Sequence, residues 1–266
     1  MINREKLAAS LDKVRQTSPL VHCITNYVAM NFNANALLAI GASPVMAHAR
    51  EEMADMTAIA SSLVLNIGTL DAQWVEGMFA AGNSMSLLGR PIILDPVGSG
   101  ATPYRTAISQ KIIGGFKPTI IRGNGSEIMS LVDADVLSKG VDSSVSSDLA
   151  LEAAKMLAKS SGAVIVISGQ TDYITDGDRV ETITNGSTMM TAVTAMGCTA
   201  TVVIGAFAAV CDDPFEAALY AMALMGVAGE RAAAISAAPA TLQLNFIDTL
   251  YSISSEELSQ SVKQCQ

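Results

Sequence analysis

Short, continuous runs of apolar residues alternate along this chain with longer segments of helical periodicity. The runs lack the polar alternation of a half-exposed strand, which is typical of strands buried on both faces. A mostly parallel sheet with helices on both sides buries strands in this way, so the pattern predicts an α/β fold. The runs cover residues 63–67, 91–95, 118–122 and 163–168, and helical segments such as 71–88 and 147–160 lie between them.

Polar or small residues follow each of the four runs. They occupy residues 68–69, 95–100, 122–127 and 168–172. Ligands of open α/β sheets bind outside the carboxyl ends of the strands. We therefore expect the functional site at this edge of the sheet.

The second half of the chain changes character. Residues 172–175 and 179–183 flank an Asp-Gly-Asp turn, which predicts an antiparallel hairpin. From Cys198 onward the chain is expected to be helical, with a loosely ordered end over the last ten residues. No internal repeat or linker is visible, so we predict one domain over residues 1–266.

Composition and charge narrow the function classes. Half of the residues are hydrophobic and 15% are charged, well below the usual share of about a quarter, which suggests that other subunits cover part of the surface. The net charge is −9 and no basic stripe is present, which argues against nucleic-acid binding. No apolar run reaches the roughly 18 residues needed to span a bilayer, and the first residues lead into an amphipathic helix. We expect a soluble, cytoplasmic protein.

The four cysteines are widely separated and form no CxxC pair. They predict neither a zinc site nor a disulfide framework, and reduced thiols fit best.

The segment 194–199, Thr-Ala-Met-Gly-Cys-Thr, carries the strongest chemical signal. Gly197 permits a tight turn and a close approach to a ligand. The apolar helix expected over 199–211 would offer unpaired N–H groups and a positive dipole end to a phosphate. A helix N-terminus also lowers the pKa of a thiol, here that of Cys198. The simpler interpretation is a glycine turn before a core helix, with Cys198 as a small buried residue.

Charged residues at two strand ends could serve the same chemistry. Asp95 could hold Mg²⁺ through water, or it could be an ordinary turn residue. Glu127 could be an outer ligand of that ion, or a capping-box partner of Asn124. Arg122 ends a buried strand and needs an anionic partner, which could be a phosphate or a carboxylate such as Asp95 or Glu127.

The two histidines, His22 and His48, are far apart and give no triad pattern with Cys198. His22 lies in an apolar stretch, so we expect a buried core histidine. The 14 methionines are expected mainly to fill gaps in the core.

Taken together, these segments resemble the hydroxyethylthiazole kinases of the ribokinase-like superfamily. The resemblance spans most of the chain, and the order of the motifs is more specific than any one of them. The matching segments are His22-Cys23-Ile24-Thr25-Asn26, Asn31-Phe32, Gly41-Ala42-Ser43-Pro44-Val45-Met46, Asn66-Ile67-Gly68-Thr69-Leu70, Asp95-Pro96-Val97-Gly98, Arg122-Gly123-Asn124 to Glu127, and Gly197-Cys198.

The resemblance implies a three-layer α/β/α sandwich with a mostly parallel central sheet. It implies ATP- and Mg²⁺-dependent phosphorylation of the hydroxyl of 4-methyl-5-(2-hydroxyethyl)thiazole, in thiamine biosynthesis or salvage. It also implies a homotrimer with active sites at the subunit contacts, where Asn26 and Met46 could face Cys198 of a neighbouring chain.

The family pattern assigns the phosphoryl-transfer residues. Cys198 stands where related kinases carry a catalytic Asp after a Gly-x-Gly turn, and we expect it to orient the acceptor hydroxyl more than to ionise. Gly197 belongs to the anion hole. Asp95 and Glu127 would position Mg²⁺ through water.

The remaining roles concern the two substrates. Arg122 and Ser168 correspond to ATP contacts, and Asn26, Met46 and Ala195 to the thiazole pocket. Ala195 departs from the family, which commonly has Gly there, so the turn must accept a Cβ next to the substrate.

Three other functions remain open at this point. A kinase for a pyrimidine alcohol is the nearest, and Cys198 and the Thr25-Asn26 pair argue against it. A dinucleotide-dependent oxidoreductase would need Gly-x-Gly-x-x-Gly after its first strand, which is missing. A non-catalytic binding protein is the third, and the presence together of Asp95, Asn124, Glu127 and Gly197-Cys198 argues against it.

Overall fold

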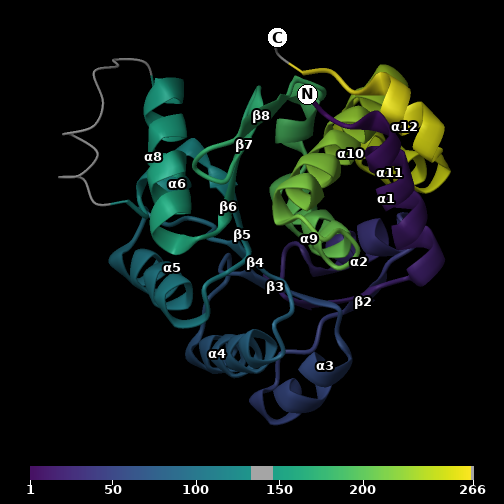
Figure 1. Ribbon diagram of the computed structural model, residues 1–266. Helices are drawn as coiled ribbons and strands as arrows, with labels where there is room; N and C mark the ends of the chain where they lie inside the picture. The colour runs from purple at the N-terminus through teal and green to yellow at the C-terminus, as the bar shows by residue number, and fades with distance from the viewer. Residues whose placement is uncertain (133–145, 265–266) are drawn as a thin grey trace.

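The computed structural model describes residues 1–132 and 146–264. One sheet of eight strands, in the order β2-β1-β3-β4-β5-β6-β7-β8, runs through the molecule with helices on both sides (Figure 1). The pairings from β2 to β6 are parallel, and β7 and β8 extend the sheet antiparallel. The strands are β1 (Leu20–Ile24), β2 (Ser43–Val45), β3 (Ser62–Asn66), β4 (Ile92–Asp95), β5 (Ile120–Asn124), β6 (Val164–Ser168), β7 (Asp172–Thr175) and β8 (Val180–Ile183).

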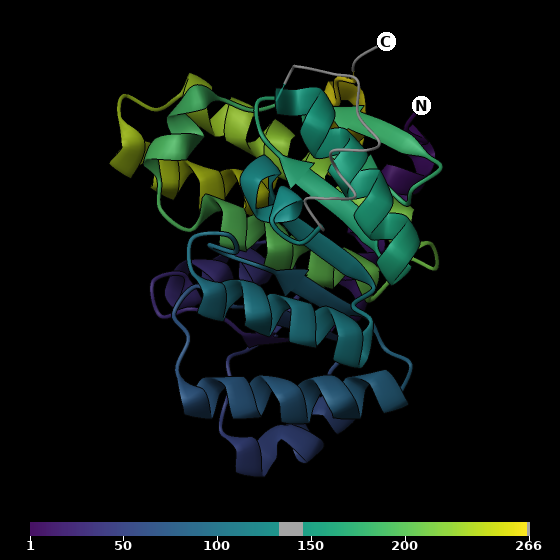
Figure 2. The same ribbon diagram turned by 90° about the vertical axis from the view of Figure 1, so that its left-hand side faces the viewer.

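Two layers of helices cover the sheet. The first consists of α1 (Arg4–Thr17), α2 (Met30–Ala39), α9 (Met196–Ala208), α10 (Pro214–Ala234), α11 (Pro239–Ser252) and α12 (Ser255–Ser261). The second consists of α3 (Met53–Ile59), α4 (Ala72–Leu87), α5 (Pro103–Phe116), α6 (Gly125–Met129) and α8 (Ser146–Ser161), and within it α4 and α5 lie side by side (Figure 2). Short 3₁₀ helices, η1 (Arg50–Glu52) and η2 (Thr188–Ala192), precede α3 and α9.

The strands supply side chains to both layers. In β3, Val64 joins the core beneath α9, whereas Leu63 and Leu65 join the core beneath α4. Because the strands are buried on both faces, their sequences are continuous apolar runs. The expected three-layer α/β/α sandwich is confirmed.

The expected elements are largely present, with informative differences. All four apolar runs form strands, and the hairpin is β7–β8. The strands β1 and β2 were not predicted, because the buried His22 interrupts one apolar run and the other strand has only three residues. Helix α9 begins at Met196 rather than Thr199, so it includes Gly197 and Cys198.

The expectation of a loose C-terminal end is wrong for its described part. Helix α12 covers part of it, with Leu258 fully buried. The backbone N–H of Thr184 donates to the carbonyl of Lys263, which holds the segment after α12 against β8. Cys265 lies outside the described residues.

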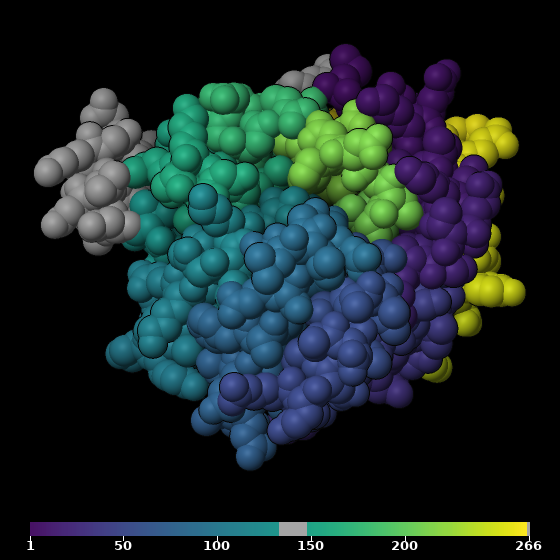
Figure 3. Space-filling view, turned by 60° about the horizontal axis from the view of Figure 1, so that its bottom comes forward, coloured from purple at the N-terminus to yellow at the C-terminus, as the bar shows by residue number. Residues whose placement is uncertain are grey.

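Residues far apart in sequence form common surfaces. Figure 3 shows a light-green surface from the C-terminal half of the chain between purple N-terminal residues and blue residues of the first half. The Lys13 ammonium, from α1, donates a hydrogen bond to the carbonyl of Val210. Within the described ranges, no helix is both long enough and apolar enough to cross a membrane.

Candidate active site at the carboxyl edge of the sheet

The N-terminus of α9 forms an anion cradle. Ala195 caps the helix in the left-handed conformation, with φ 68° and ψ −1°, and no side chain caps the first turn. Thr199 N donates to the Ala195 carbonyl at 2.8 Å, whereas the amides of Met196, Gly197 and Cys198 have no acceptor among the described residues. Three free amides at the positive end of a helix dipole suit a phosphate.

The guanidinium of Arg122 lies against this cradle. A Cβ added to Gly197 would lie 2.6 Å from Arg122 Nη1, so the glycine lets the guanidinium come this close to the helix. Arg122 Nη2 donates to Ser168 Oγ, and Nη1 lies 3.9 Å from Asp95 Oδ1. The fold thus brings together four of the expected site residues. Among the described residues, this long ion pair with Asp95 is the one contact that Arg122 makes with a carboxylate.

Asp95 is fully buried at the end of β4. Its Oδ2 accepts hydrogen bonds from Asn66 Nδ2 at 2.7 Å and Thr201 Oγ1 at 2.9 Å, whereas Oδ1 has no hydrogen-bond partner within the described residues. Burial raises the pKa of Asp95 to about 6, although the Arg122 charge opposes the shift. Oδ1 therefore has the long ion pair with Arg122 but no hydrogen bond, and it could accept a further ligand.

Cys198 lies beside Asn26, whose Nδ2 is 3.3 Å from the thiol sulfur. The pKa of the thiol is raised to about 11, first by burial and then by the charge of Asp95. The expected lowering by the helix dipole is therefore wrong, because burial outweighs it, and the thiol is protonated at neutral pH. Asn26 and Cys198 meet within one chain, so their contact needs no neighbouring subunit.

The sequence argument missed the role of Asn66, which joins the two halves of the site. Its Oδ1 accepts from Asn26 Nδ2 and from Gly68 N, both at 2.9 Å, while its Nδ2 donates to Asp95. The sequence does show that Asn66 is a polar residue near the end of an apolar run, two residues before Gly68, and this could have marked it as a site residue. Asn66 fixes the orientation of Asn26 on one side and of Asp95 on the other.

Glu127 opens α6 in a capping box with Asn124, as the simpler interpretation predicted. Its Oε2 accepts from Asn124 N at 2.8 Å, and its Oε1 accepts from Gly98 N at 2.8 Å in the loop after β4. Its charge also contributes to raising the pKa of Asp95.

The chemistry of these two carboxylates fits Mg²⁺ only in part. No group of three or more acidic, His or Cys side chains suited to a metal occurs in residues 1–132 and 146–264, so an all-protein cage is absent there. Mg²⁺ needs no such cage, since it keeps several waters and binds through one or two carboxylates plus phosphates. The free Oδ1 of Asp95 could serve as that carboxylate.

A cavity of about 490 Å³ lies beyond the ends of β5 and β6, the strands that carry Arg122 and Ser168. Its volume suits a small-molecule ligand such as a nucleoside. The wall combines backbone, polar and apolar groups, from Asn124, Gly125, Ser126, Met129, Ala150, Ile167, Gly169, Gln170, Thr171 and Tyr173.

The two other expected pocket residues lie at the same edge. Ala195 forms the cap of α9, and Met46 follows β2, half-buried against the core beneath α9. The carbonyl of Met46 accepts a hydrogen bond from His48 Nδ1 at 3.3 Å, and within the described part of the chain no hydrogen bond joins Met46 to Asn26 or Cys198.

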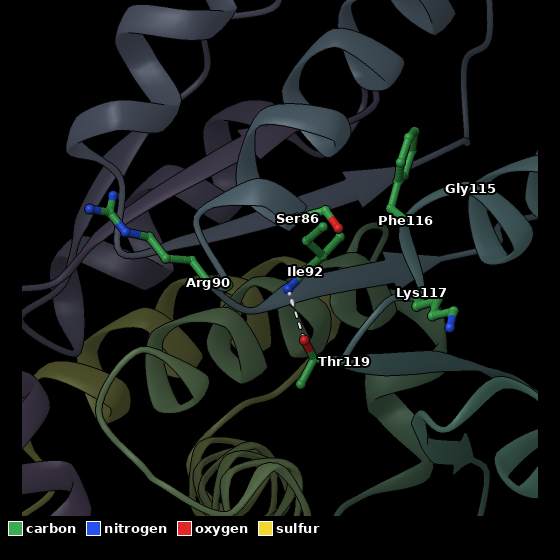
Figure 4. Close-up of a pocket in the computed structure, with 8 residues that line it drawn as sticks. Ser86, Arg90, Ile92, Gly115, Phe116, Lys117 and Thr119 are labelled. Carbon is green, nitrogen blue, oxygen red and sulfur yellow. Dashed lines mark hydrogen bonds between the residues drawn. The ribbon is translucent and has the colours of Figure 1, made fainter.

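A second cavity, of about 400 Å³, lies at the opposite edge of the sheet, where β4 and β5 begin (Figure 4). There Ile92 N donates to Thr119 Oγ1 at 3.2 Å. The guanidinium of Arg90 is committed to the carbonyl oxygens of Thr57 and Ala58, each at 3.0 Å. This cavity is separate from the acidic and thiol groups described above.

Comparison with known proteins agrees with the arrangement. Residues 11–256 match the sequence model of the hydroxyethylthiazole kinase family. A hydroxyethylthiazole kinase of Leptospira biflexa is 50% identical over 252 residues, which cover 95% of this chain and 94% of that protein. One of Nitratidesulfovibrio vulgaris is 48% identical over 263 residues, covering 99% of this chain and 98% of that protein.

Solved structures extend the comparison to the fold. The hydroxyethylthiazole kinase protein of Pyrococcus horikoshii OT3 superposes with a TM-score of 0.89 at 36% identity, covering 98% of this chain and 100% of that chain. A pyridoxal kinase of Staphylococcus aureus, solved with AMP-PCP, has a TM-score of 0.58 at 17% identity, covering 80% of this chain and 88% of that chain, and shares the fold. The chain belongs to the hydroxyethylthiazole kinase family.

Proposed function

We propose that this protein transfers the terminal phosphoryl group of ATP to the hydroxyl of 4-methyl-5-(2-hydroxyethyl)thiazole, for thiamine biosynthesis or salvage. Family membership supports the reaction. The observation that carries it is that the α9 amides and Arg122 lie beside the Asn26–Cys198 pair. A phosphate-binding site thus adjoins two polar side chains that could contact the hydroxyl of an acceptor. We further propose a single catalytic domain over residues 1–266 that acts in the cytoplasm.

The cradle and Arg122 act on the nucleotide. The adenine base of ATP would occupy the cavity beyond β5 and β6, with Ser168 and Arg122 between the adenine and the phosphates. The amides of Met196 to Cys198 would stabilise charge on the transferring group, and removing one such donor typically costs about 3 kcal/mol of transition-state stabilisation. Bound Mg²⁺ would neutralise phosphate charge, held through water by Asp95 and Glu127.

The acceptor side positions a hydroxyl for in-line attack. Asn26 and Cys198 would contact the hydroxyethyl group, with Met46 and Ala195 against the ring. Since the Cys198 thiol stays protonated at neutral pH, it orients the hydroxyl rather than removing its proton. Phosphoryl transfer depends mainly on position and electrostatics, so a strong base beside the hydroxyl is not required.

Substitution of Cys198 tests this role. We expect Cys198→Asp to keep or raise turnover, because a carboxylate both orients the hydroxyl and accepts its proton. Cys198→Ala should retain measurable turnover, which would exclude a phosphocysteine intermediate. Initial rates of ADP release under saturating ATP provide the measurement, and complete loss of activity in Cys198→Asp would contradict the orienting role.

The function itself is tested by ADP release from the purified protein with ATP and Mg²⁺, with and without the thiazole alcohol. We expect release that depends on the thiazole. Release only with a hydroxymethylpyrimidine would assign the protein to a pyrimidine-alcohol kinase instead. Release with neither alcohol would show the proposed function to be wrong.

A further inference from the structure

The indole of Trp74, in the first turn of α4, lies between the two segments that carry Asn26 and Met46. Its ring meets that of Tyr27 edge-on, with centroids 4.6 Å apart and an interplanar angle of 67°. It stacks on the ring of His48 at 4.1 Å and 11°. Tyr27 directly follows Asn26, and His48 comes two residues after Met46.

Trp74 is the buried member of this stack, whereas Tyr27 is 61% exposed and His48 is also exposed. A Cβ on Gly77, one turn further along α4, would lie 2.4 Å from the carbonyl oxygen of His48, so the helix backbone closely approaches this segment. Tyr27 N donates to Thr69 Oγ1 at 3.2 Å. Trp74 itself is only 3% exposed, and its indole N–H donates to no group among the described residues. The side chain thus contributes ring contacts rather than a hydrogen bond.

We propose that Trp74 is a positioning residue that sets the width of the acceptor pocket and thereby its specificity. The Tyr27–Trp74–His48 stack fixes the spacing between the segments 26–28 and 46–48. Shortening the middle side chain would let these segments move together or apart, while the α9 cradle and Arg122 stay in place. The inference rests on the proposed function, because it takes Asn26 and Met46 as acceptor contacts. The ligand that it concerns is a heteroaromatic alcohol with a small ring substituent.

The chain offers a matched control at another aromatic contact of α4. Phe116 of α5 packs edge-on against Phe79 of α4, with centroids 5.1 Å apart, and is 4% exposed. Phe116→Leu therefore removes a buried aromatic contact of α4 far along the sequence from segments 26–28 and 46–48. Trp74→Phe keeps a ring in the stack and guards against the case in which Trp74→Leu fails to fold.

Kinetic measurements can distinguish a role of Trp74 in positioning the acceptor pocket from a role in the stability of the protein alone. We expect Trp74→Leu to raise the KM for the thiazole alcohol about tenfold, the equivalent of losing one or two ring contacts, with the KM for ATP nearly unchanged. Trp74→Phe should give a smaller shift in the same direction, and Phe116→Leu none. The preference for a 4-methyl over a 4-ethyl ring, measured as the ratio of kcat/KM values, should fall in Trp74→Leu alone.

The unmodified protein provides a second readout. Trp74 is the single tryptophan of the chain, so intrinsic fluorescence reports this junction. We expect the thiazole alcohol to change the emission in a saturable manner, and a non-hydrolysable ATP analogue to leave it unchanged.

Two results would overturn the inference: an unaltered emission with bound thiazole alcohol, or equal changes in both KM values in the two Trp74 variants. Both would leave the proposed function intact if the wild type still releases ADP. Failure of the wild type to turn over the thiazole would instead reject the proposed function, and the inference with it.

Discussion

At the residue scale, Ala195 occupies a backbone conformation that suits glycine. Its φ of 68° places it in the left-handed region, where a Cβ costs on the order of 1 kcal/mol. The strain lies at the cap of α9, immediately before the amides of the cradle. The sequence indicated a departure from the family pattern here, but the torsion angle was available only from the structure.

Replacing Ala195 with Gly should relieve this strain. We expect Ala195→Gly to raise the free energy of unfolding by about 1 kcal/mol, measured by urea denaturation. Ala209 at the other end of α9 has φ −71°, so Ala209→Gly should instead lower stability, by about 0.5–1 kcal/mol. Equal effects of the two substitutions would show that the left-handed cap is not strained.

The buried carboxyl of Asp95 predicts a pH dependence. Its pKa is raised to about 6, so the carboxylate needed near the phosphates becomes protonated as the pH falls through that value. We expect kcat/KM for ATP to be constant above pH 7 and to fall below about pH 6, because this ratio reports the free enzyme.

A second carboxyl could produce the same profile, since burial also raises the pKa of Asp172 to about 6. Asp172→Asn is therefore the control, and it should leave the acid limb of the profile in place. Loss of that limb in Asp172→Asn would transfer the dependence from Asp95 to Asp172.

At the scale of elements, the predictable part of the fold depended on strands buried on both faces. Such strands consist of nearly continuous apolar residues and can be recognised from the sequence, as β3 to β6 show. The edge strand β2 is only half-buried and contains a proline, so its sequence does not show a continuous apolar run.

The candidate site could likewise be predicted only in part. The polar residues at the strand ends are visible in the sequence, whereas the hydrogen-bond partners of Asn66 depend on which strands are neighbours in the sheet.

Helix α6 has only five residues and depends on its capping box. Glu127→Gln keeps a side-chain acceptor but loses one of the two backbone hydrogen bonds and the charge. We expect a loss of about 1 kcal/mol in stability and a rise of about tenfold or more in the Mg²⁺ concentration for half-maximal activity. Denaturation and Mg²⁺ titration of the rate provide the two measurements.

The capping box of α12, formed by Ser254 and Glu257, is the matched control. Glu257→Gln should reduce stability similarly and leave the Mg²⁺ requirement unchanged. If Glu127→Gln also left that requirement unchanged, Glu127 would serve α6 alone.

At the scale of the whole molecule, we propose a homotrimer. The share of charged residues is low, and large apolar side chains such as Leu87, Ile235, Leu244 and Tyr251 are more than two-thirds exposed. Light scattering should give about 83 kDa, three times the chain mass of 27.6 kDa. A mass near that of one chain would exclude the assembly. The Asn26–Cys198 contact is complete within one chain, so a neighbour would add further walls to the site rather than this pair.

Helix α9 packs against β1, β3 and β4 beneath it and against α1, α2 and α10 around it, and nearly all of its residues are buried. A helix enclosed in this way cannot swing toward a ligand. Its three free amides therefore keep their direction throughout the reaction cycle, and the reorganisation energy of orienting them is spent once, when the chain folds. Electrostatic preorganisation of this kind means that the diffusing partners must align with a rigid array of dipoles.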